Sequence, residues 1–232
     1  MRTTLIHIAL ILVSVRGFAQ KAELKQRCHK LMSQIEGDAP FHLQYTITVQ
    51  GKGEKPEEGS IKMNLYKNGS DEEFIMGDIQ EVMHKNKILF LINHSQKSIL
   101  VKTDTSTNDK SNILTELDKF VDSSTTITSS KKGGLIKYAL SYGESYMYKR
   151  AELVFSSSTG KLTTIYAEFA ANYPEQYNSM KVEYQLWDTS WKPEADFPNY
   201  TKYIVMSGTT YRTQDNYKNY KIIQPQQGTQ KY

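Results

Sequence analysis

The sequence predicts a mostly β (α+β) fold, in which a single antiparallel sheet of about eleven strands curls into an unclosed half-barrel under amphipathic helices. Beyond residue 40, apolar and polar residues alternate along much of the chain, which is the pattern of half-buried strands. The connections between these segments are short, which favours antiparallel neighbours. Two other segments have the three- and four-residue spacing of helices, and they could cover the concave apolar face.

Residues 1–19 have the pattern of a secretory signal peptide. Arg2 provides the positive start, an apolar run extends from Leu5 to Val15, and small residues lead to Ala19. The run is shorter than the roughly 20 apolar residues that span a bilayer. We therefore predict cleavage after Ala19, a mature chain without a transmembrane segment, and a location in the periplasm or outside the cell.

The net charge argues against a nucleic-acid-binding protein, and the cysteine content argues against a disulfide-stabilised one. The formal net charge is +4 at pH 7, and loss of Arg2 and Arg16 with the signal lowers it to +2. No basic stripe remains to indicate a nucleic-acid partner. Cys28 is the only cysteine, so the domain must be stabilised by burial rather than by an intramolecular disulfide. We predict a monomer with one domain over residues 20–223 and a disordered tail over residues 224–232.

Two amphipathic helices are predicted. In the first, Leu24, Cys28, Leu31 and Ile35 recur at helical spacing, and the helix ends near Pro40. On this interpretation Cys28 is a small buried apolar residue and not a reactive thiol. The second helix has one apolar face, formed by Ile113, Leu114, Leu117, Phe120 and Val121.

Alternation and turn chemistry predict the strands. Hairpin turns are indicated at Asn68-Gly69, at Asn86-Lys87 and at 158–160. The strands are predicted at 41–50, 61–65, 74–76, 79–84, 88–93, 98–103, from 125, and at 135–142, 148–156, 161–170, 179–187 and 202–206.

Catalytic and cofactor motifs are not found in the sequence. His29, His42, His84 and His94 do not stand at metal-ligand spacing. The acidic clusters at 57–58 and 71–73 lie in or beside turns, where solvated charge is expected. We predict a protein without enzymatic activity, cofactor or metal. The alternative is an enzyme whose site converges from loops, in which His42, His84 or His94 would be required.

Tyrosine is concentrated in the second half of the chain, where 14 of the 16 tyrosines follow residue 137. They could form an aromatic platform for sugars or lipid headgroups. We favour the simpler interpretation, that tyrosine suits the half-solvated face of a sheet.

The order of elements over residues 22–103 resembles the LolA-like periplasmic lipoprotein carriers of Gram-negative bacteria. The features are the first helix, the strand that begins at Pro40-Phe41, the Gly59-led strand that ends at Lys67-Asn68, and the hairpin at Asn86-Lys87. The resemblance implies an unclosed barrel with a cavity that receives acyl chains. Carriers of proteobacterial type have an arginine after the second strand, where this chain has Asn68, so the resemblance implies binding without implying cargo transfer.

The alternation and the resemblance together predict a binding site for lipid or lipoprotein acyl chains. The alternative is that this protein is an interaction or sensor module, which has the same fold with a filled interior and docks an envelope protein as its partner. The predicted cavity is lined by Leu43, Tyr45, Ile47, Met63, Leu65, Phe74, Met76, Phe90, Ile92, Val182, Tyr184 and Leu186.

Overall fold

A computed structural model describes residues 2–52, 58–103, 117–172, 177–208 and 210–224, with side chains from Ala19 onward. Most of the predicted tail, 225–232, lies outside the described residues. The helices are α1 (Arg2–Glu36) and α2 (Leu117–Ser123), with short 3-10 turns η1 (Tyr200–Lys202) and η2 (Asp215–Tyr217). The strands are β1 (Phe41–Gly51), β2 (Glu58–Asn68), β3 (Asp71–Met76), β4 (Gln80–Lys85), β5 (Ile88–Asn93), β6 (Ser98–Thr103), β7 (Thr126–Lys132), β8 (Leu135–Ser141), β9 (Tyr148–Ser156), β10 (Leu162–Phe169), β11 (Tyr177–Asp188), β12 (Ile204–Ser207), β13 (Thr210–Thr213) and β14 (Lys221–Ile223).

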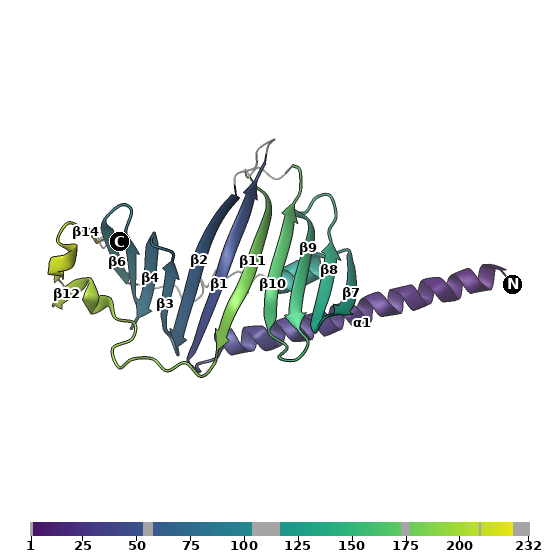
Figure 1. The fold of residues 1–232 in the computed structure, drawn as a ribbon, viewed down its shortest axis with the longest axis horizontal. Coiled ribbons are helices and arrows are strands. Elements are labelled where there is room, and N and C mark those ends of the chain that lie inside the picture. The colour runs from purple at the N-terminus through teal and green to yellow at the C-terminus, as the bar shows by residue number, and fades with distance from the viewer. Residues whose placement is uncertain (1, 53–57, 104–116, 173–176, 209, 225–232) are drawn as a thin grey trace, which may run out of the picture. The chain divides into compact units, whose positions relative to one another are not determined.

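The predicted fold class is confirmed: the protein is mostly β, and its main sheet is open. Among the described residues the hydrogen-bonded order is β14-β6-β5-β4-β3-β2-β1-β11-β10-β9-β8-β7, with β12 and β13 in a separate pair (Figure 1). The two end strands, β14 and β7, do not pair, so the sheet is not closed into a barrel. The prediction that the sheet is antiparallel throughout was wrong at one edge, because β14 pairs with β6 in parallel and the sheet is therefore mixed.

The chain divides into two compact units. Unit 1 contains Met1–Glu36, Thr46–Ser60 and Lys110–Gln185, and unit 2 contains Gly37–Tyr45, Ile61–Asp109 and Leu186–Tyr232. The single domain over residues 20–223 stays a prediction. Across the part of the chain that is described, no helix is long and apolar enough to cross a membrane.

In unit 1, α1 packs against α2 and β7, and Phe120 of α2 packs against Ala151 of β9 and Ala167 of β10. The face predicted for the first helix is confirmed, because Leu24, Cys28, Leu31 and Ile35 are all buried. Arg27 donates a hydrogen bond of 3.0 Å to the hydroxyl of Tyr138 on β8. Lys25 forms an ion pair of 2.6 Å with Asp122 at the end of α2.

The second predicted helix is confirmed where it is described. Leu117, Phe120 and Val121 of α2 are buried, whereas Ile113 and Leu114 lie outside the described residues. The sheet face below the helices is apolar because the register aligns Val182, Ile165, Leu153 and Tyr138 across four strands.

Unit 2 contains β2 to β6, and their tight turns fix which residues share a face. The β4–β5 turn consists of Asn86 and Lys87, both with positive φ (51° and 64°), as a two-residue hairpin requires. The ladder pairs Lys85 with Ile88 directly before and after the turn. Each side chain position in β5 is thereby determined by the position of its partner in β4.

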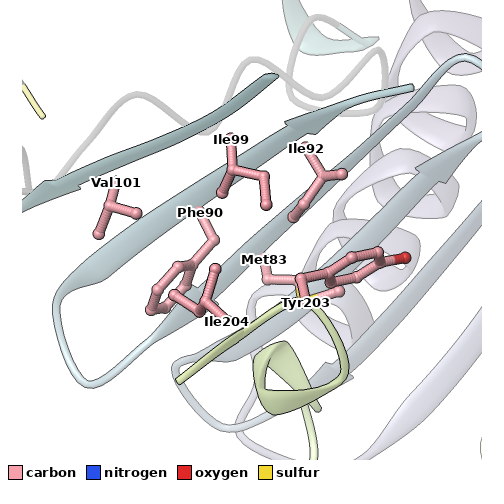
Figure 2. Packing of buried hydrophobic residues seen from close by; sticks show 7 residues of the cluster. All are labelled: Met83, Phe90, Ile92, Ile99, Val101, Tyr203 and Ile204. Carbon is pink, nitrogen blue, oxygen red and sulfur yellow. The ribbon is translucent and has the colours of Figure 1, made fainter. Parts of the chain in front are cut away.

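Residues 200–208 and 210–220, which we call the C-terminal segment, cover one face of β4, β5 and β6, and β14 extends the sheet beside β6. Tyr203 and Ile204 lie against Met83, Phe90, Ile92, Ile99 and Val101 (Figure 2). The ring of Tyr200 stacks on that of Phe90 with centroids 4.5 Å apart. Tyr211, Tyr217 and Tyr220 pack against the same cluster from the covering segment. The short strands β13 and β14 were not predicted.

Candidate functional site

The sheet of unit 2 has two faces, named here by two adjacent residues of β2. The Leu65 face carries Leu65 and the residues in register with it, and the Tyr66 face carries Tyr66 and its register partners. The C-terminal segment covers the Tyr66 face over β4 to β6, because Met83, Phe90 and Ile99 belong to that face. The Leu65 face is therefore the other surface of the same strands.

An unbroken line of apolar side chains crosses the Leu65 face, and we call it the apolar row. Each member is the direct partner of the next in successive ladders. The row consists of Leu65, Phe74, Val82, Leu91, Leu100 and Ile223. Leu65 is 8% exposed, the next four side chains are half-buried, and Ile223 is 42% exposed. The row thus runs from a buried end at β2 to an exposed end at β14.

Polar side chains border the apolar row on both sides. On one side the line that begins with Met63 and Met76 continues through Gln80, Asn93, Ser98 and Lys221. On the other side the line contains Lys67, Glu72, His84, Leu89 and Lys102. From Val82 outward the apolar surface is therefore about one side chain wide, except at β5, where the border residue Leu89 is also apolar.

The length of the apolar row follows from strand spacing. Six adjacent strands with a spacing of about 4.8 Å give a row of about 24 Å. A surface that is long and one residue wide matches a single extended hydrocarbon chain. A helix, with a diameter of about 10 Å, would extend over the polar borders as well.

The predicted site residues are divided between the two units. Ile47, Val182 and Tyr184 belong to unit 1, and the remaining nine belong to unit 2. Ile47, Phe74 and Met76 are half-buried, whereas Leu186 is 38% exposed. The other residues of the predicted set are buried, namely Leu43, Tyr45, Met63, Leu65, Phe90, Ile92, Val182 and Tyr184. That the set holds a ligand stays a prediction.

Six of the predicted site residues in unit 2 share the Leu65 face, namely Leu43, Tyr45, Met63, Leu65, Phe74 and Met76. Met63 pairs with Met76, and Leu65 pairs with Phe74. On β1, His42 and Gln44 alternate with Leu43 and Tyr45. The side chains of His42 and Gln44 both form hydrogen bonds with Asn64, which lies on the Tyr66 face. Leu43 and Tyr45 therefore point to the Leu65 face. Burial raises the pKa of Tyr45 to about 12, so this residue stays neutral and adds apolar surface.

Phe90 and Ile92 were assigned to the wrong face. In the structure they pair with Met83 and Glu81, on the Tyr66 face, and they are buried beneath the C-terminal segment. Strand β5 is apolar on both sides, so its own alternation does not identify the face. The turn lengths do, because three residues separate Met76 from Gln80 and two separate Lys85 from Ile88. Counting through these turns places Val82 and Leu91 with Phe74.

The three histidines proposed for an enzyme do not converge. His42 stacks on Tyr66 with ring centroids 4.1 Å apart. His84 lies 3.1 Å from the carbonyl oxygen of Ser70, and His94 lies 3.2 Å from a carboxylate oxygen of Glu81. Within the described ranges no group of His, Cys, Asp or Glu has the arrangement of a metal site.

Comparison with solved structures finds remote similarity. A LolA superfamily protein from Nitrosomonas europaea matches with 10% identity and a TM-score of 0.31, over 75% of this chain and 96% of its own. A protein domain from Vibrio parahaemolyticus, described as outer membrane lipoprotein-sorting, matches with 8% identity and a TM-score of 0.33, over 77% and 97%. An uncharacterised conserved protein from Thermus thermophilus matches with 10% identity and a TM-score of 0.42, over 88% and 98%. No family model and no curated protein matches the chain.

Proposed function

We propose that the protein is an exported, non-enzymatic binder of lipid acyl chains and that the apolar row is its binding surface. The apolar row carries the proposal, because its six side chains are aligned across six strands between polar borders. An extended acyl chain lying along it would contact apolar side chains throughout its length. Its polar end would reach the exposed end of the row at Ile223.

Burial alone provides enough free energy for such binding. Each methylene group removed from water contributes about 0.8 kcal/mol, so ten contribute about 8 kcal/mol, which corresponds to a Kd of about 1 μM. A surface row leaves part of the chain in water, so we expect a Kd of roughly 1–100 μM. The proposed binding requires no catalytic group.

The test uses the mature protein, purified under native conditions. Native mass spectrometry and organic extraction should find bound fatty acid or phospholipid, and a fluorescent fatty acid should bind with saturation. The proposal would be abandoned if the extract contained no acyl compound and the fluorescent fatty acid did not bind. A protein that binds a soluble envelope partner but no acyl compound would favour the interaction module instead.

Export is tested separately from ligand binding. If residues 1–19 act as a signal peptide, the exported protein begins at Gln20. Intact-mass measurement of the protein from a periplasmic or secreted fraction checks this cleavage. A cell-associated protein of full-length mass would contradict it, whatever the result of the lipid experiment.

A further inference from the structure

A hollow lies in unit 2, on the Tyr66 face. It has a volume of about 360 Å³, which is within the range of small-ligand pockets. Its lining comes from β2, β3 and the segment 191–202, and we call it the Trp191 pocket. The lining residues are Tyr66, Glu73, Trp191, Lys192, Glu194, Asp196, Phe197, Asn199 and Lys202.

Three aromatic rings form the walls of the Trp191 pocket. The rings of Tyr66 and Trp191 have centroids 5.4 Å apart, and those of Trp191 and Phe197 are 5.1 Å apart. His42 stacks on Tyr66 with centroids at 4.1 Å. Aromatic rings attract cations through the negative charge of their faces. The walls thus suit a cationic group with apolar substituents.

The segment that carries two of these rings is held in place by one lysine. The ammonium group of Lys85 on β4 donates hydrogen bonds to the carbonyl oxygens of Asp196, Phe197 and Pro198, at 2.7, 2.9 and 3.4 Å. Such charge-assisted bonds are stronger than neutral ones. They support a pocket that is formed before a ligand arrives.

A carboxylate pair that shares one ammonium group lies beside these walls. Lys202 Nζ is 3.2 Å from Glu73 Oε1 and 3.0 Å from Glu81 Oε2. Solvated charge was predicted at residues 71–73, but the Glu73 side chain is only 12% exposed. Burial raises the pKa of Glu73, although the charge of Lys202 opposes this. Two carboxylates and one ammonium group leave one negative charge uncompensated within this trio.

We propose that the Trp191 pocket binds an organic ammonium group, with Glu73 as its counter-ion and the rings of Tyr66, Trp191 and Phe197 around its carbon substituents. The ammonium group could belong to a lipid headgroup or to a lysine side chain of a protein. Three of the five charged side chains that line the pocket are acidic, namely Glu73, Glu194 and Asp196. The other two, Lys192 and Lys202, are basic, so the acidic side chains of the lining outnumber the basic ones.

This ligand is separate from the one proposed for the apolar row. Tyr66 and Glu73 pair with each other on the Tyr66 face, whereas the apolar row lies on the Leu65 face. The two surfaces are on opposite sides of the sheet. Binding of an ammonium compound and binding of an acyl chain can therefore succeed or fail independently.

The experiment uses tryptophan fluorescence in a Trp187→Phe background, in which Trp191 is the only tryptophan of the chain. Choline represents a lipid headgroup and Nα-acetyl-lysine amide represents a protein side chain. Both are titrated at constant ionic strength, with sodium acetate and sodium phosphate as anionic controls. We expect at least one ammonium compound to change Trp191 emission with saturation and the anions to have no effect. The tighter ammonium compound identifies the source.

Two matched variants locate the binding. Glu73→Gln should weaken ammonium binding about tenfold or more, because it removes the partly buried counter-ion. Glu72→Gln removes the same charge one residue away, on the Leu65 face, and should change binding less than threefold. Thermal unfolding shows whether both variants are folded. If Glu73→Gln is not folded, Trp191→Leu replaces it, with binding followed by saturation transfer to the choline methyl groups.

Three outcomes would overturn the proposal. One is the absence of a saturable response to either ammonium compound. Another is a response to acetate or phosphate instead. The third is equal weakening by the Glu73→Gln and Glu72→Gln variants, because this would indicate a general charge effect and not a counter-ion in the pocket.

Discussion

Val82 of β4 and Leu91 of β5 lie directly opposite each other on the Leu65 face of unit 2. Phe90, the residue before Leu91, lies opposite Met83 on the other face, beneath the C-terminal segment. Consecutive residues of one strand therefore have different environments. Leu91 is half-buried in the apolar row, and Phe90 is 1% exposed in a closed core.

Replacing Leu91 should impair ligand binding without unfolding the protein. Leu91→Gln places an amide in the middle of the apolar row, and we expect at least a tenfold weaker affinity for a fluorescent fatty acid. Leu89→Gln is the control, since Leu89 belongs to the border line on the same face of the same strand. It should change the affinity less than threefold. Equal affinities for the two variants would place the ligand elsewhere.

Phe90→Ala should destabilise the protein by about 3–5 kcal/mol, because it leaves a cavity in a closed core. Phe90 is fully enclosed and stacks on Tyr200. Leu91→Ala should cost less, about 1–2 kcal/mol, because a half-buried side chain loses less contact. Urea denaturation of both variants measures the difference. If Leu91→Ala were the more destabilising variant, the assignment of the faces would be wrong.

Cys28 should be unreactive in the folded protein. Burial raises the pKa of its thiol to about 12, and the charge of Asp118 adds to this effect. At neutral pH the thiol is therefore protonated and enclosed, whereas the reactive form is the exposed thiolate. A disulfide reagent at pH 8 should not label Cys28 in the native protein. In denaturant, labelling of Cys28 should proceed at the rate at which the protein unfolds. Rapid labelling of the native protein would show that α1 does not hold Cys28 in the core.

The stability contribution of Glu81 should depend on pH. Burial raises the pKa of this carboxyl, but a hydrogen bond from Tyr203 and the charge of Lys202 outweigh it and hold the pKa below the ordinary value of 4.5. A carboxyl with a lowered pKa stabilises the fold above its ordinary pKa, and this contribution is lost as the pH falls through the folded-state value.

We therefore expect Glu81→Gln to lower the free energy of unfolding by about 1–3 kcal/mol at pH 7. The difference from the unchanged protein should shrink progressively below about pH 4.5. Urea denaturation at pH 7, 5, 4 and 3 measures it. A difference that stayed constant over this range would show that Glu81 is not held ionised by Tyr203 and Lys202.

The sequence predicted local structure well, because the information is local. The helical spacing of Leu24, Cys28, Leu31 and Ile35 identified a buried face, and Asn86-Lys87 identified a hairpin. The face of β5 was not recovered from its own residues, since Phe90 and Leu91 are both apolar. It depends on turn lengths accumulated from β3, a signal that was present in the sequence.

Other features could not be predicted because they depend on distant contacts. Glu73 was expected to be solvated since it follows two acidic residues near a turn. Its burial results from the segment around Trp191 and Lys202, more than a hundred positions later. The Trp191 pocket likewise combines β2 and β3 with residues 191–202, and no local pattern indicates that these segments meet.

The parallel pairing of β14 with β6 has a consequence for biosynthesis. Strand β6 is translated long before Lys221–Ile223, and until then its outer hydrogen-bonding groups have no partner from β14. An unpaired strand edge is a template for association with other chains. The nascent protein thus exposes such a template until Lys221–Ile223 leave the ribosome, so export as an unfolded chain, followed by folding after release, would shorten the period at risk.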